Sequence, residues 1–165
     1  MQHLIAILLL GLSLSALPLT PAQATQNLPM AEADPAAAAV QSHEPVRVLA
    51  RVSISRQMME VYHEGRKIYE WPVSTARRGK ITPVGTWSGA QWLSRNHRSS
   101  RYNGAPMPFA IFYNGNYAIH GTDQIRKLGR PASAGCVRLH PENARILFNM
   151  VRAEGKENLE VVVVR

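Results

Sequence analysis

Hydrophobic and polar residues alternate along several short stretches of this chain, a pattern typical of half-buried β-strands. The first such stretch is 47–55. Two more apolar stretches follow it, 58–62 and 68–74, with a polar turn containing Gly65 between them. Two such stretches around a glycine-containing turn predict a hairpin. Pro72 predicts that its second strand lies at a sheet edge or carries a bulge. In the first stretch, 47–55, the apolar residues at every second position are Val48, Ala50, Val52 and Ile54.

Two segments in the middle of the chain have opposite character. Residues 109–119 are rich in Phe, Tyr and Ile and are interrupted by Asn-Gly-Asn at 114–116. This is a strong hairpin signal, and it places His120 at the end of the second strand. The preceding segment, 76–108, is polar enough to predict a long functional loop that moves over a sheet. Its most charged part contains Arg95, His97, Arg98 and Arg101.

One helix stands out near the C-terminus. Pro141 is suited to a first-turn position, and the helix should end at Gly155. The run 159–164 is apolar and predicts a buried last strand. Many short strands and one principal helix predict a mainly β domain. The residues expected on the buried face of the helix are Ala144, Leu147, Phe148 and Val151.

The first 24 residues predict an export signal. The apolar run 4–17 is shorter than the roughly 20 residues that span a bilayer, and small residues at Ala22 and Ala24 fit signal-peptidase cleavage after Ala24. No Lys or Arg precedes the run, so a retained N-terminal anchor is the alternative. No Cys follows it as a lipid attachment site. We expect the protein in the periplasm or on the cell-wall side of the membrane.

Composition and charge divide the rest of the chain in two. Residues 25–46 are rich in Ala and Pro without a sustained period and predict a tether. Residues 47–165 form the expected folded domain, with 19 basic and 8 acidic residues, or +11. Such an excess predicts an anionic partner. For an exported protein this means acidic polymers or lipids of the cell envelope, so we do not expect nucleic acid.

The lone cysteine, Cys136, is the main candidate for chemistry. A single cysteine cannot form an internal disulfide, which leaves buried filler, an intermolecular link or a nucleophile. Small residues precede the sulfur and Arg138 follows it, a setting that a core cysteine does not need. A cation such as an imidazolium would lower the pKa of the thiol, and His120 is the obvious partner. The spacing of these two residues does not by itself exclude a structural role for His120.

The remaining histidines have other expected roles. His3 lies in the signal and His43 in the tether, whereas His63 and His97 fall in polar turns or loops, where solvated side chains are expected. His140 directly precedes the helix proline and belongs to its N-terminal boundary. No metal-ligand spacing or nucleotide-binding loop is present, and we expect no cofactor.

The segment from His120 to Leu139 closely resembles a known catalytic signature. His-Gly-Thr at 120–122, Gly129 and Ser-x-Gly-Cys-Val-Arg-Leu at 133–139 match that of the L,D-transpeptidase (YkuD-type) family. The resemblance extends to Val-Ser-Thr at 73–75, Thr-Pro-x-Gly at 82–85 and Met-Pro-Phe at 107–109. It therefore covers about 48–164 and implies a β-sandwich with one principal helix after the catalytic loop.

The resemblance implies an acyl-transfer mechanism. Cys136 would attack the carbonyl between the third residue of a peptidoglycan stem and D-Ala, and D-Ala would leave. His120 would carry protons, oriented by the backbone carbonyl of Gly121. The backbone N–H groups of Gly135 and Cys136 would form the oxyanion hole. Arg138 would either recognise a carboxylate or support the loop, and Ser133 and Thr122 would either bind substrate or turn the backbone.

The sequence allows more than one acceptor of the acyl group. We expect an amine of a second stem peptide and 3-3 cross-links, which would serve cell-wall biogenesis and cell shape. Water would make the protein an L,D-carboxypeptidase, and an envelope lipoprotein would make it a tethering enzyme. A carbapenem is the expected covalent inhibitor. Ala134 stands where many relatives have His, which bears on acceptor choice.

Two other classes of protein share parts of this pattern. Sortases use His, Cys and Arg in the same order, but their His lies much farther upstream and their Arg farther past the Cys. A non-catalytic basic module that binds the wall would need only the +11 charge. The presence of both His120 and Cys136 argues against it.

Overall fold

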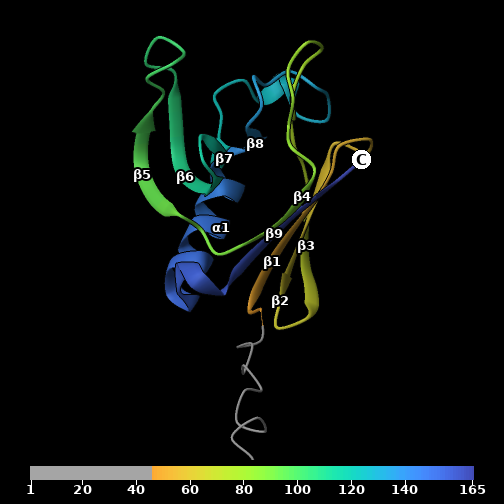
Figure 1. Ribbon diagram of the computed structural model, residues 1–165, viewed down its shortest axis with the longest axis vertical. Helices are drawn as coiled ribbons and strands as arrows, with labels where there is room; N and C mark the ends of the chain where they lie inside the picture. The colour runs from red at the N-terminus through yellow and green to blue at the C-terminus, as the bar shows by residue number, and fades with distance from the viewer. Residues whose placement is uncertain (1–45) are drawn as a thin grey trace, which may run out of the picture. The chain divides into compact units, whose positions relative to one another are not determined.

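The computed structural model describes residues 46–165. The expected signal peptide and all of the expected tether except its last residue lie outside these residues. The described part contains nine strands, one α-helix and two short 3-10 helices (Figure 1). In chain order they are β1 (Val48–Ser53), β2 (Met58–His63), β3 (Arg66–Pro72), β4 (Gly85–Ser88), β5 (Trp92–Arg98), β6 (Pro106–Asn114), β7 (Tyr117–Gly121), η2 (Ile125–Lys127), β8 (Val137–Leu139), α1 (Pro141–Glu154), η3 (Lys156–Asn158) and β9 (Leu159–Val164).

Five strands form one sheet in the order β3-β2-β1-β9-β4. β1 and β9 run parallel, with Val48 opposite Leu159, although they lie at opposite ends of the described chain. The alternation in the first stretch is confirmed, because Val48, Ala50 and Val52 are buried. β3 is an edge strand, as Pro72 predicted. Most of its residues are exposed.

Four strands form the second sheet in the order β5-β6-β7-β8. The hairpin expected at 114–116 joins β6 to β7, and β7 pairs in parallel with β8. A left-handed backbone at Phe109, with φ of 55°, interrupts the alternation of β6. As a result Phe109 and Ile111 belong to the main core, whereas Met107 joins a small cluster on the opposite face of the sheet.

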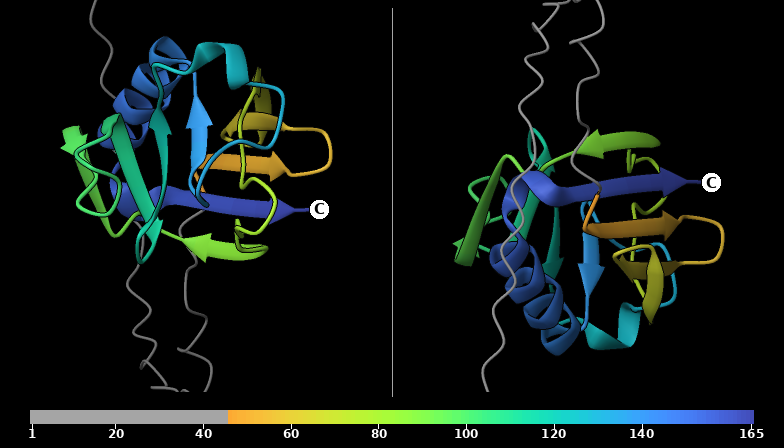
Figure 2. Two further views of the ribbon diagram at one scale, coloured as in Figure 1. Left: turned by 90° about the horizontal axis from the view of Figure 1, so that it is seen from above. Right: turned by 90° about the horizontal axis from the view of Figure 1, so that it is seen from below.

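Helix α1 packs mainly on β6 and β7, and Figure 2 shows it beside these strands in both views. The expected buried face is confirmed: Ala144, Leu147, Phe148 and Val151 are buried. The helix begins after His140, whose Nδ1 accepts a hydrogen bond from the Glu142 N–H. His140 is therefore the helix boundary that the sequence predicted. It caps one of the N–H groups that a helix start leaves without a partner.

The prediction of a long mobile loop over 76–108 is wrong. Strands β4 and β5 and the start of β6 occupy much of it. β4 pairs with β9 and β5 with β6, so pairing partners distant in sequence decide the structure there. β5 carries Arg95, Asn96 and Arg98 on an exposed strand, which is why its composition resembles a loop.

The mainly β fold with two sheets and one principal helix is confirmed by this architecture. The helix directly follows the segment that carries Cys136. Within residues 46–165, no helix has both the length and the apolar character that crossing a membrane requires.

Candidate active site

The parallel pairing of β7 with β8 brings the predicted histidine and cysteine into one cavity. Ile119 lies opposite Val137, and His120 lies opposite Arg138. Because side chains alternate along a strand, Ile119 and Val137 face the main core and His120 faces the other side of the sheet. Cys136 directly precedes β8. It lines the same cavity as His120, and the cavity volume is about 810 Å³.

His120 is buried and held in one orientation. Its side chain is 6% exposed, and its Nδ1 lies 2.6 Å from the carbonyl oxygen of Gly121. A carbonyl only accepts, so Nδ1 carries the proton and Nε2 keeps a free lone pair. Burial lowers the pKa of His120 to about 4, more than the hydrogen bond to Gly121 raises it, so the imidazole is neutral near pH 7.

Cys136 is half-buried, and its Sγ donates a hydrogen bond to the carbonyl oxygen of Asn116 at 3.7 Å. Burial raises the pKa of this thiol above its ordinary value. A backbone hydrogen bond from Ala118 and the charge of Arg138 lower the pKa but offset only part of the rise.

The protonation states correct one expectation. The sequence predicted a sulfur ionised by an imidazolium. In the free protein, burial disfavours the charged form of both groups, so Cys136 is a neutral thiol and His120 a neutral imidazole. The site therefore contains a proton acceptor, Nε2 of His120, and a protonated thiol, that of Cys136.

The loop before the cysteine turns through Ser133 and Gly135. The N–H of Gly135 donates to Ser133 Oγ at 3.0 Å, so the serine side chain supports the turn. Gly135 has φ of 141°. A Cβ at this position would lie 2.9 Å from the carbonyl oxygen of Ile81 and 2.8 Å from the ring of Tyr117. Only glycine fits here without a shift of the backbone.

Thr82 ties a second segment to the same loop. Its buried Oγ1 donates to the carbonyl oxygen of Gly135 at 2.8 Å and accepts from the N–H of Ala76 at 2.9 Å. Behind it, the Gln57 side chain accepts from the N–H of Thr75 and donates to the Thr75 hydroxyl. These bonds support the loop from the segments that connect strands of the other sheet.

Arg138 is almost fully buried, with 9% of its surface exposed, and its partners are neutral. Nη1 donates to Gln124 Oε1 at 3.2 Å and Nη2 to Ser74 Oγ at 3.4 Å. Its Nε has no hydrogen-bond partner among the described residues. The N–H of Gln124 in turn donates to Thr122 Oγ1, so Thr122 supports the backbone beside Arg138.

Two histidines do not lie where the sequence placed them. His97 is in β5, not in a solvated loop, and lines the cavity with His120. Its ring packs edge-on against Trp92 and Phe112, with centroids 5.2 and 5.0 Å apart. His63 ends β2, and its Nε2 lies 2.9 Å from Glu154 Oε1.

Sequence reasoning missed several residues that support the site. Thr82 lies in the quoted Thr-Pro-x-Gly motif, which was a usable signal. Gln57, Gln124 and Asn116 had no sequence signal, because each acts through a contact that only the fold creates. Among the described residues, no group of three or more His, Cys, Asp or Glu side chains is placed to hold a metal ion.

The two-sheet β domain, with a buried His and a Cys in one cavity, fits the L,D-transpeptidase class that the sequence motif indicated. Comparisons with known proteins support this class. The L,D-transpeptidase catalytic domain (YkuD) family model matches residues 47–164. The probable L,D-transpeptidase YbiS of Escherichia coli strain K12 is 30% identical over 103 residues, which cover 48% of this chain and 33% of that protein. The match thus spans about a third of the curated relative.

Solved structures share the fold. The L,D-transpeptidase from Mycobacterium smegmatis aligns with a TM-score of 0.64 and 21% identity, over 72% of this chain and 59% of that one. The LD transpeptidase LdtMt1 in complex with imipenem aligns with a TM-score of 0.63 and 21% identity, over 72% and 59%. The chain belongs to the L,D-transpeptidase catalytic domain family, because the family model covers nearly all of the described residues.

Proposed function

We propose that this protein is an exported cysteine L,D-transpeptidase that takes its acyl group from a peptidoglycan tetrapeptide stem. The observation that carries the proposal is the contact of 2.6 Å between His120 Nδ1 and the Gly121 carbonyl. It leaves Nε2 as a proton acceptor in the cavity that also contains Cys136.

The first half of the reaction forms an acyl-enzyme. His120 Nε2 takes the proton from the Cys136 thiol as the sulfur attacks the carbonyl between the third stem residue and D-Ala. The C–N bond then breaks, and His120 gives the proton to the departing amine of D-Ala. Because the Cys136 thiol and the His120 imidazole are both neutral at the start, no charge has to be separated between them before the substrate binds.

The developing oxyanion needs N–H donors. The N–H of Cys136 is the primary donor in this proposal, because that of Gly135 is engaged with Ser133 Oγ. Gly135 would contribute only by exchanging that bond for the oxyanion. One such donor typically contributes about 2.7–4 kcal/mol to the transition state.

The second half transfers the acyl group to an amine. His120 takes a proton from the acceptor amine, which attacks the thioester and releases Cys136. We propose a second stem peptide as acceptor, which gives a 3-3 cross-link outside the cytoplasmic membrane. Water or an amine of an envelope lipoprotein would give the alternative carboxypeptidase or tethering reaction.

The test is to incubate the full chain with tetrapeptide muropeptides and, separately, with imipenem, which a solved relative binds. We expect the wild-type protein to release D-Ala and to gain the mass of imipenem. Cys136→Ala should do neither while keeping its far-UV circular dichroism. Dimeric muropeptides among the products would identify a stem peptide as acceptor.

The contrary result is equally specific. A wild-type protein that binds sacculi but shows an unmodified mass and releases no D-Ala would be a non-catalytic wall-binding module. An imipenem adduct that persists in Cys136→Ala would place the reactive group elsewhere.

A further inference from the structure

Acidic and basic residues are distributed unequally over the domain. Between 76 and 134 the sequence has nine Arg or Lys residues and one acid, Asp123. The other acids of 46–165 lie in the two flanking segments, on strands of the five-stranded sheet, in their turns, or in and beside α1 and η3. The segment that contains most of the cavity lining therefore has a net charge of nine minus one, or +8, out of the +11 of residues 47–165.

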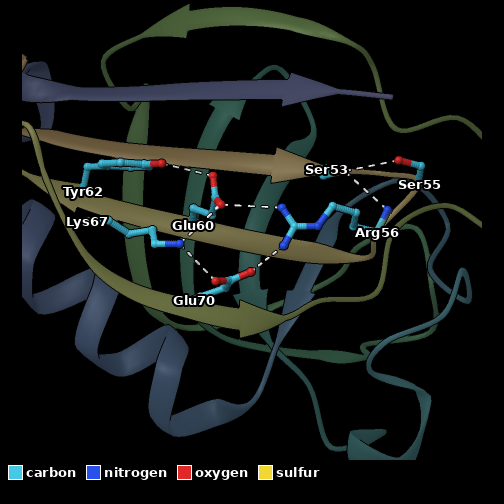
Figure 3. A network of polar contacts seen from close by, with 7 residues as sticks. All are labelled: Ser53, Ser55, Arg56, Glu60, Tyr62, Lys67 and Glu70. Atoms are coloured by element: carbon cyan, nitrogen blue, oxygen red, sulfur yellow. Dashed lines mark hydrogen bonds and ion pairs between the residues drawn. The ribbon is translucent and has the colours of Figure 1, made fainter.

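On the five-stranded sheet one group of charges forms ion pairs within the protein. Arg56 pairs with Glu60 and Glu70, and Lys67 pairs with the same two carboxylates at 3.6 and 3.1 Å (Figure 3). Tyr62 also donates to Glu60. Arg56 and Lys67 thus both have carboxylate partners within the protein.

The cations around the cavity do not. Arg77, Arg101 and Lys127 line the cavity from three separate segments, the β3–β4 loop, the β5–β6 loop and η2. None of the three forms an ion pair with a carboxylate among residues 46–165. Arg77 donates instead to the carbonyl oxygen of Ser133. Asp123 is the one carboxylate that the described chain contributes to the lining.

A concave site lined by one sign of charge concentrates ligands of the opposite sign. In this cavity Arg138 adds a buried guanidinium with neutral partners. The arrangement suits a peptide with several carboxylates. A carboxamide in place of one of those carboxylates would have nearly the same shape but would carry no charge.

We propose that Arg101 and Lys127 make this cavity selective for donor peptides whose third residue carries a free side-chain carboxylate over donors with a carboxamide there. The inference rests on the proposed function and deepens it. Both residues are specificity determinants, because each is exposed, is not one of the motif residues that define the catalytic signature, and forms no ion pair with another residue of 46–165.

The experiment uses two synthetic tetrapeptides that end in D-Ala and differ only in a carboxylate or a carboxamide on the third side chain. kcat/KM for D-Ala release is measured for the full chain at low and at high salt. The variants are Arg101→Gln and Lys127→Gln. Arg66→Gln is the matched control, because Arg66 is an exposed cation on β3, outside the cavity, with no ion pair to another described residue.

We expect the wild-type protein to prefer the carboxylate donor at low salt and to lose part of the preference at high salt. Each cavity variant should reduce the preference by about two- to fivefold, and Arg66→Gln should not. Alkylation of Cys136 by uncharged iodoacetamide should be unchanged in all variants, which checks that the site is intact.

Equal kcat/KM for both donors in the wild-type protein would overturn the selectivity, as would a preference that both cavity variants retain in full. Variants that bind sacculi less well but keep the donor preference would show that the cations serve an anionic polymer instead. Failure of the proposed function is distinguishable, since neither peptide nor imipenem would then react.

Discussion

Burial of single residues sets the chemistry of the cavity. Both reactive groups are largely removed from water, and for both the neutral form is favoured. His120 is held by one short hydrogen bond to its neighbour's carbonyl, which in the proposed mechanism does what the carboxylate of a conventional triad does. Arg138 lies near the thiol, and within the described chain its side chain donates hydrogen bonds to Gln124 and Ser74 and forms no ion pair with a carboxylate.

The low pKa of His120 predicts a pH dependence of stability. In the unfolded chain a histidine titrates near 6.5, whereas in the folded protein the pKa is about 4. Between these values the unfolded state binds the proton and the folded state does not, so stability falls as the pH falls. From about pH 7.5 to about pH 4 the loss should be about 3 kcal/mol, measured by urea denaturation.

The control for this prediction is His120→Gln, which cannot titrate. The difference in unfolding free energy between the two proteins should change with pH over this window by the predicted amount. If both proteins lose stability in parallel, the buried histidine is not the cause.

Gly135 gives a second prediction at this scale. In Gly135→Ala the new methyl group would meet the Ile81 carbonyl and the Tyr117 ring, so the loop must shift and move Cys136 with it. A misplacement of about 1 Å can cost about 100-fold in rate. We expect at least that loss in the rate of imipenem acylation, followed by intact mass.

Gly65→Ala is the matched control for the backbone angle. Gly65 also has positive φ, but a Cβ there would meet nothing within 4 Å, and the residue lies in the β2–β3 turn. It should lose some stability but acylate at the wild-type rate. Equal acylation by both variants would contradict the steric argument.

Among the elements, the segment between β7 and β8 depends on others for its shape. It contains η2 and Cys136, and it is held by Thr82 from the β3–β4 loop. The hairpin of β6 and β7 was predictable from its Phe, Tyr and Ile residues and the Asn-Gly-Asn turn. β4 and β5 were not, because their polar composition resembles a loop and only pairing with β9 and β6 makes them strands.

Thr82→Val tests this support. Valine has nearly the shape of threonine but leaves the buried Gly135 carbonyl and Ala76 N–H without a partner. An unsatisfied buried group costs about 1–3 kcal/mol, so we expect a stability loss of at least that size and slower D-Ala release. Thermal unfolding and D-Ala release measure the two effects.

Thr86→Val makes the same substitution on an exposed position of β4. We expect it to leave both quantities nearly unchanged. If Thr82→Val behaves like this control, the hydroxyl of Thr82 does not position the loop.

For the whole molecule, the parallel pair of β1 and β9 joins the two ends of the described chain inside one sheet. This predicts that residues 46–165 fold without the preceding segment. The fragment should unfold cooperatively and gain the mass of imipenem as the full chain does. A shorter fragment that starts at 54 lacks β1 and should not fold. A fragment 46–165 that aggregates while the full chain is folded would contradict the prediction.

The sequence by itself determined the class of fold, the helix with its buried face and the identity of His120 and Cys136 as candidates, since these depend on periodicity, turn residues and a specific motif. Only the tertiary structure decided how Thr82 and Gln57 support the loop, that His97 enters the cavity and that the reactive pair is neutral. These properties arise from contacts between distant segments and from the water that packing excludes, and neither is encoded in local spacing.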